Sequence, residues 1–154
     1  MPLTRRRLLA GLAATPAALA LPLAPALAAP PVYAEGGLAC DGTDVVAYFT
    51  EGRAVPGDPA IALDWNGARW LFASDASRAA FEADPSAHAP QYGGYCAYAA
   101  SKGYIAPTDP AAWTIAEGRL FLNYSRSVRA LWLLDRDGHI ARADANWPGL
   151  LDTA

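Results

Sequence analysis

Two stretches of the chain alternate loosely between apolar and polar residues on either side of a short turn. The turns are Asn66-Gly67, a pair that favours a tight hairpin, and Glu117-Gly118. The flanking segments are Ile61–Trp65 with Arg69–Ala73, and Trp113–Ala116 with Arg119–Tyr124. We therefore expect two β-hairpins. The uninterrupted apolar run Val45–Phe49, rich in β-branched and aromatic residues, predicts one further buried strand.

Residues that cap helices divide the rest of the chain. Ser74 and Ser125 each stand where a hydroxyl can accept the first free N–H groups of a helix. Gly103 and Gly138 are typical of the residue that ends one, and Asp84-Pro85 stops the first helix and starts another turn. The predicted helices are Ala76–Ala83, Ala97–Lys102, Arg126–Leu134 and His139–Asn146. The pattern shows no internal repeat and predicts a small, compact α+β domain.

The beginning of the chain has the features of an export signal. Arg5-Arg6-Arg7 precedes an alanine-, leucine- and proline-rich run that extends to Ala29, and the cluster resembles a twin-arginine signal. Ala26-Leu27-Ala28 supplies a cleavage triplet. We expect a signal peptide over residues 1–28 and export to the periplasm. The alternative is a membrane anchor, but the prolines within the run disfavour a permanent span, so no stable anchor is expected after cleavage.

Composition narrows the classes of function. The chain has 154 residues, 53% of them hydrophobic and 18% charged, and its net charge is −3. This fits one soluble domain, which we place over residues 44–150 after a Gly/Pro-rich lead over 29–43. An acidic chain argues against a nucleic-acid partner. Two cysteines and two histidines are too few for a four-cysteine or three-histidine metal site.

A set of segments spread in order over nearly the whole mature chain carries a family pattern. They are Asp44–Gly52, Trp65-Asn66-Gly67, Leu71–Ser74 with Phe81, Asp84-Pro85, Tyr92–Ala97 and the tail Ala143–Pro148. Together they resemble the YHS-domain family, in particular its exported single-domain branch. The resemblance implies a metal-associated module. The metal-ligand positions that it implies fall on Ala47, Ala73 and Ser77, where no thiolate or imidazole is present.

Cys96 is the strongest candidate for chemistry. It follows two glycines at the predicted start of a helix, a place that favours the thiolate. With His88, Tyr92 and Tyr95 it would offer thiolate, imidazole and phenol donors to copper or zinc. Two alternatives stay open for this thiol, a buried structural cysteine and a disulfide with Cys40.

The resemblance and this thiol together predict an exported, non-catalytic, metal-associated binding protein. Copper is the first candidate metal and zinc the second, with Cys96, His88, Tyr92 and Tyr95 as ligands. One alternative is a metal-free module that binds a small ligand or a protein through an aromatic pocket. The other is a thiol-redox protein. No serine elbow, phosphate loop or metalloprotease helix motif is present in the sequence, so an enzyme is not expected.

Overall fold

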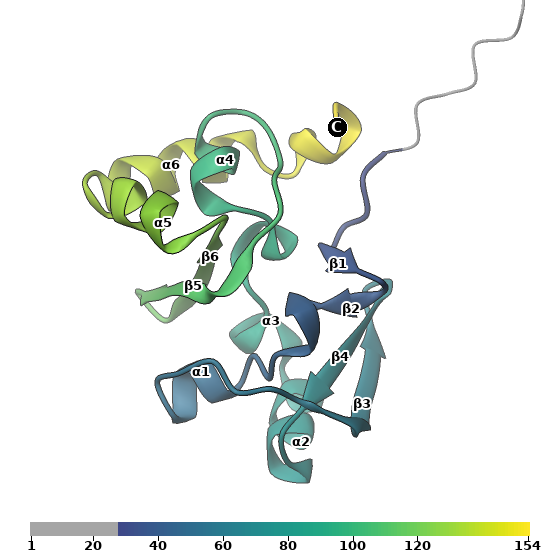
Figure 1. Ribbon diagram of the computed structural model, residues 1–154. Helices are drawn as coiled ribbons and strands as arrows, with labels where there is room; N and C mark the ends of the chain where they lie inside the picture. The colour runs from purple at the N-terminus through teal and green to yellow at the C-terminus, as the bar shows by residue number, and fades with distance from the viewer. Residues whose placement is uncertain (1–27) are drawn as a thin grey trace, which may run out of the picture.

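The computed structural model describes residues 28–154, and Figure 1 shows their arrangement. Helices and strands are both well represented, which confirms the predicted α+β class. The elements in chain order are β1 (Ala34–Glu35), β2 (Leu38–Ala39), η1 (Cys40–Gly42), α1 (Ala47–Thr50), β3 (Asp58–Trp65), β4 (Ala68–Phe72), α2 (Asp75–Ala83), α3 (Pro85–His88), η2 (Gln91–Gly94), α4 (Ala97–Ser101), β5 (Asp109–Ala116), β6 (Arg119–Asn123), α5 (Arg126–Leu133), α6 (Arg136–Asn146) and η3 (Gly149–Asp152).

The expected export signal lies outside the described residues, apart from its last position. Within residues 28–154 no helix is both long and apolar enough to cross a membrane.

The first predicted hairpin builds the larger sheet. β3 and β4 pair antiparallel on either side of Asn66-Gly67. β2 adds to β4 in parallel and β1 adds to β2, which gives the order β1-β2-β4-β3. β1 and β2 belong to the segment that the sequence separates as a lead. Because Val32 and Cys40 are each only 3% exposed in the core, that segment is part of the fold.

The run Val45–Phe49 does not form the predicted strand, and most of it is the short helix α1. The buried carboxylate of Asp44 accepts the backbone N–H groups of Val46 at 2.9 Å and Ala47 at 3.4 Å, which favours a helical turn. Every residue from Val45 to Tyr48 is buried. An apolar run that is buried all round carries no period, so its pattern cannot separate a helix from a strand.

The second predicted hairpin is also present, as β5 and β6. Gly138 differs from its prediction, because it lies inside α6 and ends no helix. The preceding helix, α5, ends at Leu133. A Cβ at position 138 would lie 2.4 Å from the carboxylate oxygens of Asp135. The glycine therefore makes room for that carboxylate at the start of α6.

The two hairpins are copies of one another, which the residue pattern does not reveal. The facing residues are Asp58↔Phe72, Ala62↔Leu71, Leu63↔Trp70, Asp64↔Arg69 and Trp65↔Ala68 in the first, and Asp109↔Asn123, Trp113↔Leu122, Thr114↔Phe121, Ile115↔Leu120 and Ala116↔Arg119 in the second. Each residue of the second set lies 51 positions after its counterpart, and both hairpins shift register after the first pair. The fold therefore contains an internal duplication.

The same spacing continues into the helix that follows each hairpin. The hydroxyls of Ser74 and Ser125 cap α2 and α5 by accepting an N–H three residues further on, at 3.1 and 3.2 Å. The side chains of Arg78 and Arg129 both reach back from these helices to the outer strand of their own hairpin. The repeat thus covers a hairpin, a serine cap and a helix.

Each copy has an aromatic pair in its core, with the two residue types exchanged. The rings of Trp70 and Phe81 are 4.9 Å apart in the first copy, and those of Phe121 and Trp132 are 5.3 Å apart in the second. All four side chains are buried. The exchange keeps the total volume of the pair while it alters the shape, which core packing tolerates.

Two apolar cores meet at β6. Leu120 and Leu122 belong to the first core, and Phe121 between them belongs to the second. Successive side chains of a strand point to opposite faces, so β6 separates the cores. We call residues 32–89 the N-lobe and residues 95–154 the C-lobe; η2 lies between them, and Figure 1 shows the two lobes side by side.

Candidate functional site

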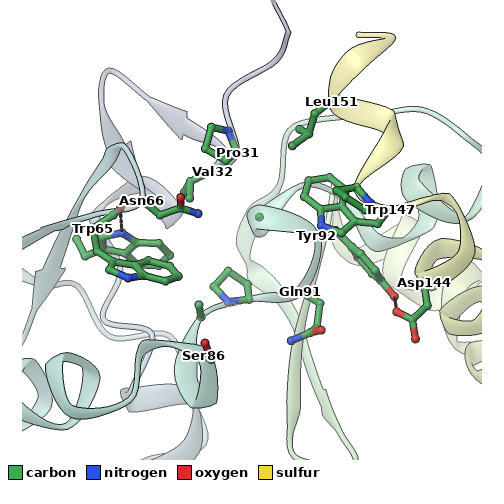
Figure 2. Close-up of a pocket in the computed structure, with 15 residues that line it drawn as sticks. Pro31, Val32, Trp65, Asn66, Ser86, Gln91, Tyr92, Asp144, Trp147 and Leu151 are labelled. Carbon is green, nitrogen blue, oxygen red and sulfur yellow. Dashed lines mark hydrogen bonds between the residues drawn. The ribbon is translucent and has the colours of Figure 1, made fainter.

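A cleft of about 520 Å³ opens where the lobes meet (Figure 2). The turn of the first hairpin lines one side, and the segment that follows α6 lines the other. η2, the chain that leads into β1, and α3 with the residues directly after it complete the lining. Small-molecule sites commonly have volumes of about 300–1,000 Å³, so this cleft is large enough for a small organic ligand.

Aromatic side chains from both lobes form the sides of the cleft. Trp65 comes from the N-lobe and Trp147 from the C-lobe, and Figure 2 shows them on opposite sides of the opening. Trp65 packs at 5.7 Å against Trp70, whose indole N–H donates to the Trp65 carbonyl at 3.0 Å. Trp147 packs at 6.1 Å against Tyr92. Both Trp65 and Trp147 are only partly buried, so each offers ring surface to a ligand.

A close contact between two backbone segments forms the floor. Gly93 has φ +62°, and a Cβ there would lie 2.1 Å from the Pro31 carbonyl oxygen. The backbone N–H of Tyr33 donates to the Gly93 carbonyl at 2.9 Å. The leading segment can approach η2 this closely only because position 93 has no side chain.

Asp144 and Arg119 form an ion pair at the C-lobe side. The guanidinium donates to both carboxylate oxygens, at 2.7 and 3.1 Å, and the Tyr92 hydroxyl donates to the same carboxylate at 2.8 Å. The hydrogen bonds from Arg119 lower the pKa of Asp144. Burial, together with the bond to Asp144, raises the pKa of Tyr92. Near neutral pH the Asp144 carboxylate is therefore charged and paired with the Arg119 guanidinium, and the Tyr92 phenol is neutral.

Gln91 links this ion pair to the cleft. Its side-chain carbonyl accepts from Nε of Arg119 at 3.0 Å, which fixes the orientation of the amide. Figure 2 shows the amide nitrogen turned toward the N-lobe side of the cleft. The residues that line the cleft thus include one hydrogen-bond donor of fixed orientation, the amide N–H of Gln91.

Of the four predicted metal donors, Tyr92 lines the cleft. Tyr95 donates its hydroxyl proton to the Pro30 carbonyl at 2.9 Å, and burial raises its pKa. His88 lies at the end of α3, where Nδ1 is 3.1 Å from the Asp84 carbonyl oxygen and the ring meets Phe49 edge-on at 5.5 Å. Tyr92, Tyr95 and His88 therefore have different hydrogen-bond partners, which lie in different parts of the fold.

Cys96 stands directly before α4, as predicted, and is 1% exposed. Its sulfur accepts the backbone N–H of Tyr124 at 3.2 Å and lies 3.7 Å from the side-chain oxygen of Asn123. A second cavity, of about 280 Å³, lies beside it between the exposed rings of Tyr104 and Tyr124. The thiol is thus engaged by the backbone N–H directly after β6.

Cys40 and Cys96 are both free and buried, so the disulfide considered as an alternative is not formed. Burial raises the pKa of Cys40 to about 12, which leaves that thiol protonated and unreactive. Across residues 28–154 no group of three or more His, Cys, Asp or Glu side chains stands together as metal ligands. The copper or zinc site, which also drew on tyrosines, stays a prediction from the sequence.

The cleft depends on residues that the sequence did not single out for a site. The aromatic pocket of the metal-free alternative was predicted without named residues, so Trp65 and Trp147 were not singled out, and neither were Asp144, Arg119 and Gln91. One local signal was present: Trp65 stands directly before the Asn66-Gly67 turn, where a side chain lies near the surface. Trp65 and Trp147 line the same cleft only because the two lobes pack against each other, which no local pattern predicts.

Comparison of the chain with models of protein families, with curated proteins and with solved structures finds no match.

Proposed function

We propose that this chain is an exported, non-catalytic binding protein whose small-molecule ligand occupies the cleft between the lobes. The cleft itself carries the proposal: it has a volume of about 520 Å³, with Trp65 and Trp147 on opposite sides. Aromatic side chains contribute large contact areas at ligand sites. Export is supported by the arginine cluster and the apolar run within residues 1–28.

The protonation states at the cleft favour binding over acid–base catalysis. Asp144 is held in its charged form by Arg119, and the pKa of Tyr92 is raised. An acid or base works best when its pKa lies near the working pH. Neither group meets that condition near neutral pH.

The test is a screen of small molecules that spans anionic, cationic and neutral classes, read by thermal shift on the mature protein. We expect hits that bind the wild type and the Tyr104→Ala variant equally. Tyr104 is a suitable control because it is an aromatic residue, 54% exposed, and does not line the cleft. The same hits should be lost or weakened in Trp147→Ala.

Trp147→Leu serves as a second variant, since it keeps apolar volume and removes the ring. If both Trp147 variants fold and bind every hit as the wild type does, the cleft is not the ligand site and the proposal fails.

A further inference from the structure

The charges around the cleft restrict the ligands that it can hold, and this inference rests on the proposed binding function. Among the described residues that line the cleft, Asp144 and Tyr92 are those that ionise within its walls. Arg119 already neutralises Asp144 through two hydrogen bonds, and the phenol of Tyr92 donates to the same carboxylate. An ionic ligand therefore finds no free counter-charge on this surface, and would lose hydration without compensation.

The shape of the cleft favours a flat ligand. Trp65 and Trp147 approach from different lobes, and each has part of its ring open to solvent. Pro90 and Gly93 also line the cleft and project no long side chain into the space. Aromatic rings prefer other rings in offset-stacked or edge-to-face contact, so a planar ring can pack against either tryptophan.

The orientation of Gln91 adds a directional element. Its carbonyl oxygen is taken by Arg119, so the group that remains for a ligand is the N–H donor. A ligand that displaces water from this donor must present an acceptor of its own, because a buried donor without a partner is costly.

We infer that the cleft binds a neutral planar heteroaromatic molecule, with its ring against Trp65 or Trp147 and a ring nitrogen or carbonyl acceptor directed at the Gln91 amide. The ion pair behind Gln91 then has a positioning role: Arg119 holds the amide so that its donor faces the ligand.

Four probes that share one fused bicyclic aromatic frame test the inference. Quinoline at pH 8 is neutral and has an acceptor. Naphthalene is neutral without one, N-methylquinolinium is a cation with its nitrogen blocked, and 1-naphthoate is an anion. Binding to the mature protein is followed by NMR on the indole N–H signals of its five tryptophans. Quinoline should shift the Trp65 and Trp147 signals and bind about tenfold or more tightly than either ion.

Variants separate stacking from the hydrogen bond. Trp65→Leu and Trp147→Leu should each weaken the binding of quinoline by about tenfold. Tyr104→Ala should leave the binding of quinoline unchanged. Gln91→Glu keeps an acceptor for Arg119 and removes the donor. This variant should weaken the binding of quinoline by several-fold and leave the binding of naphthalene unchanged.

Each unfavourable result has a definite meaning. If either ion binds as tightly as quinoline and depends on the two tryptophans, the ligand class is wrong while the binding function stands. The ligand class is equally wrong if Gln91→Glu weakens naphthalene as much as quinoline, or if no probe reaches the tryptophans. The mixed screen above then decides separately whether the cleft binds small molecules at all.

Discussion

The carboxylate of Asp44 and the thiol of Cys96 accept backbone N–H groups from equivalent positions in the two copies of the duplicated unit. Asp44 accepts the backbone N–H of Ala73 at 2.9 Å, and Cys96 accepts that of Tyr124 at 3.2 Å. Ala73 and Tyr124 are themselves 51 positions apart and follow equivalent strands, β4 and β6. The structure thus gives Cys96 a backbone-binding role that Asp44 performs in the N-lobe.

Removal of the Cys96 sulfur should lower stability. Cys96→Ala leaves the Tyr124 N–H without its acceptor, and we expect a loss of about 1–3 kcal/mol in the free energy of unfolding. Cys96→Ser keeps an acceptor and should lose less. Chemical denaturation of the two variants and the wild type measures the difference. A Cys96→Ala variant as stable as the wild type would contradict the structural role.

Elemental analysis of the same samples, purified after native export, tests the copper prediction. If about one copper per chain is present in the wild type and absent from Cys96→Ala, the thiol is a metal ligand. If metal content does not change between them, the backbone contact is sufficient to explain this residue.

The counterpart in the N-lobe should be the more sensitive position. Asp44 is fully buried and accepts N–H groups from Val46, Ala47 and Ala73. Asp44→Ala leaves all three N–H donors without an acceptor. We expect the free energy of unfolding to fall by about 3 kcal/mol or more. Asp58→Ala is the matched control, because that exposed carboxylate accepts a single N–H and should lose about 1 kcal/mol or less. Equal losses for the two variants in urea denaturation would refute this account.

Local chemistry made much of this fold predictable. Asn66-Gly67 and Glu117-Gly118 form the hairpin turns as expected, and Ser74 and Ser125 cap the expected helices. At these positions the turn or the cap is made by residues close in sequence. Asp84 likewise caps the turn that starts at Pro85, as its sequence suggests.

The parts that failed have no signature in the pattern of apolar and polar positions. α1 is set by a carboxylate in a run with no period, and Gly138 responds to the approach of Asp135. The duplication is hidden because packing conserves volume and shape more than identity, as the exchange of Trp70 with Phe121 illustrates. The residues of the cleft were not identified because Trp65 and Trp147 come to line one cleft only once both lobes are formed.

The floor of the cleft should tolerate no side chain at position 93. Gly93→Ala sets a Cβ 2.1 Å from the Pro31 carbonyl oxygen, at φ +62°. Gly118→Ala is the control, since its φ is +72° but nothing lies within 4 Å of the added atom. We expect about 1–2 kcal/mol of destabilisation from the positive φ alone in Gly118→Ala. Gly93→Ala should lose roughly 2 kcal/mol more from the clash, measured by chemical denaturation. Equal effects would mean that the leading segment moves away freely.

His139 should make stability depend on pH in the mildly acidic range. The side chain is buried, and Nδ1 lies 3.0 Å from Nη2 of Arg142 and 2.8 Å from Oγ of Ser101. Arg142 can only donate, so its guanidinium favours an unprotonated Nδ1. Burial first, and then the charges of Arg142 and Lys102, lower the pKa of His139 below its usual 6.5.

The sign of the effect follows from proton uptake. Below about pH 6.5 the unfolded chain binds a proton at this histidine while the folded chain does not, so the free energy of unfolding falls as the pH drops. The lowered pKa of Asp144 acts in another window, because its contribution is lost only below its usual 3.8. Denaturation at pH 7 and at about pH 5.5 should therefore show a loss in the wild type that His139→Gln reduces. A variant with the same pH dependence as the wild type would assign the titration to another group, and would show that protonated His139 is accommodated in the folded C-lobe.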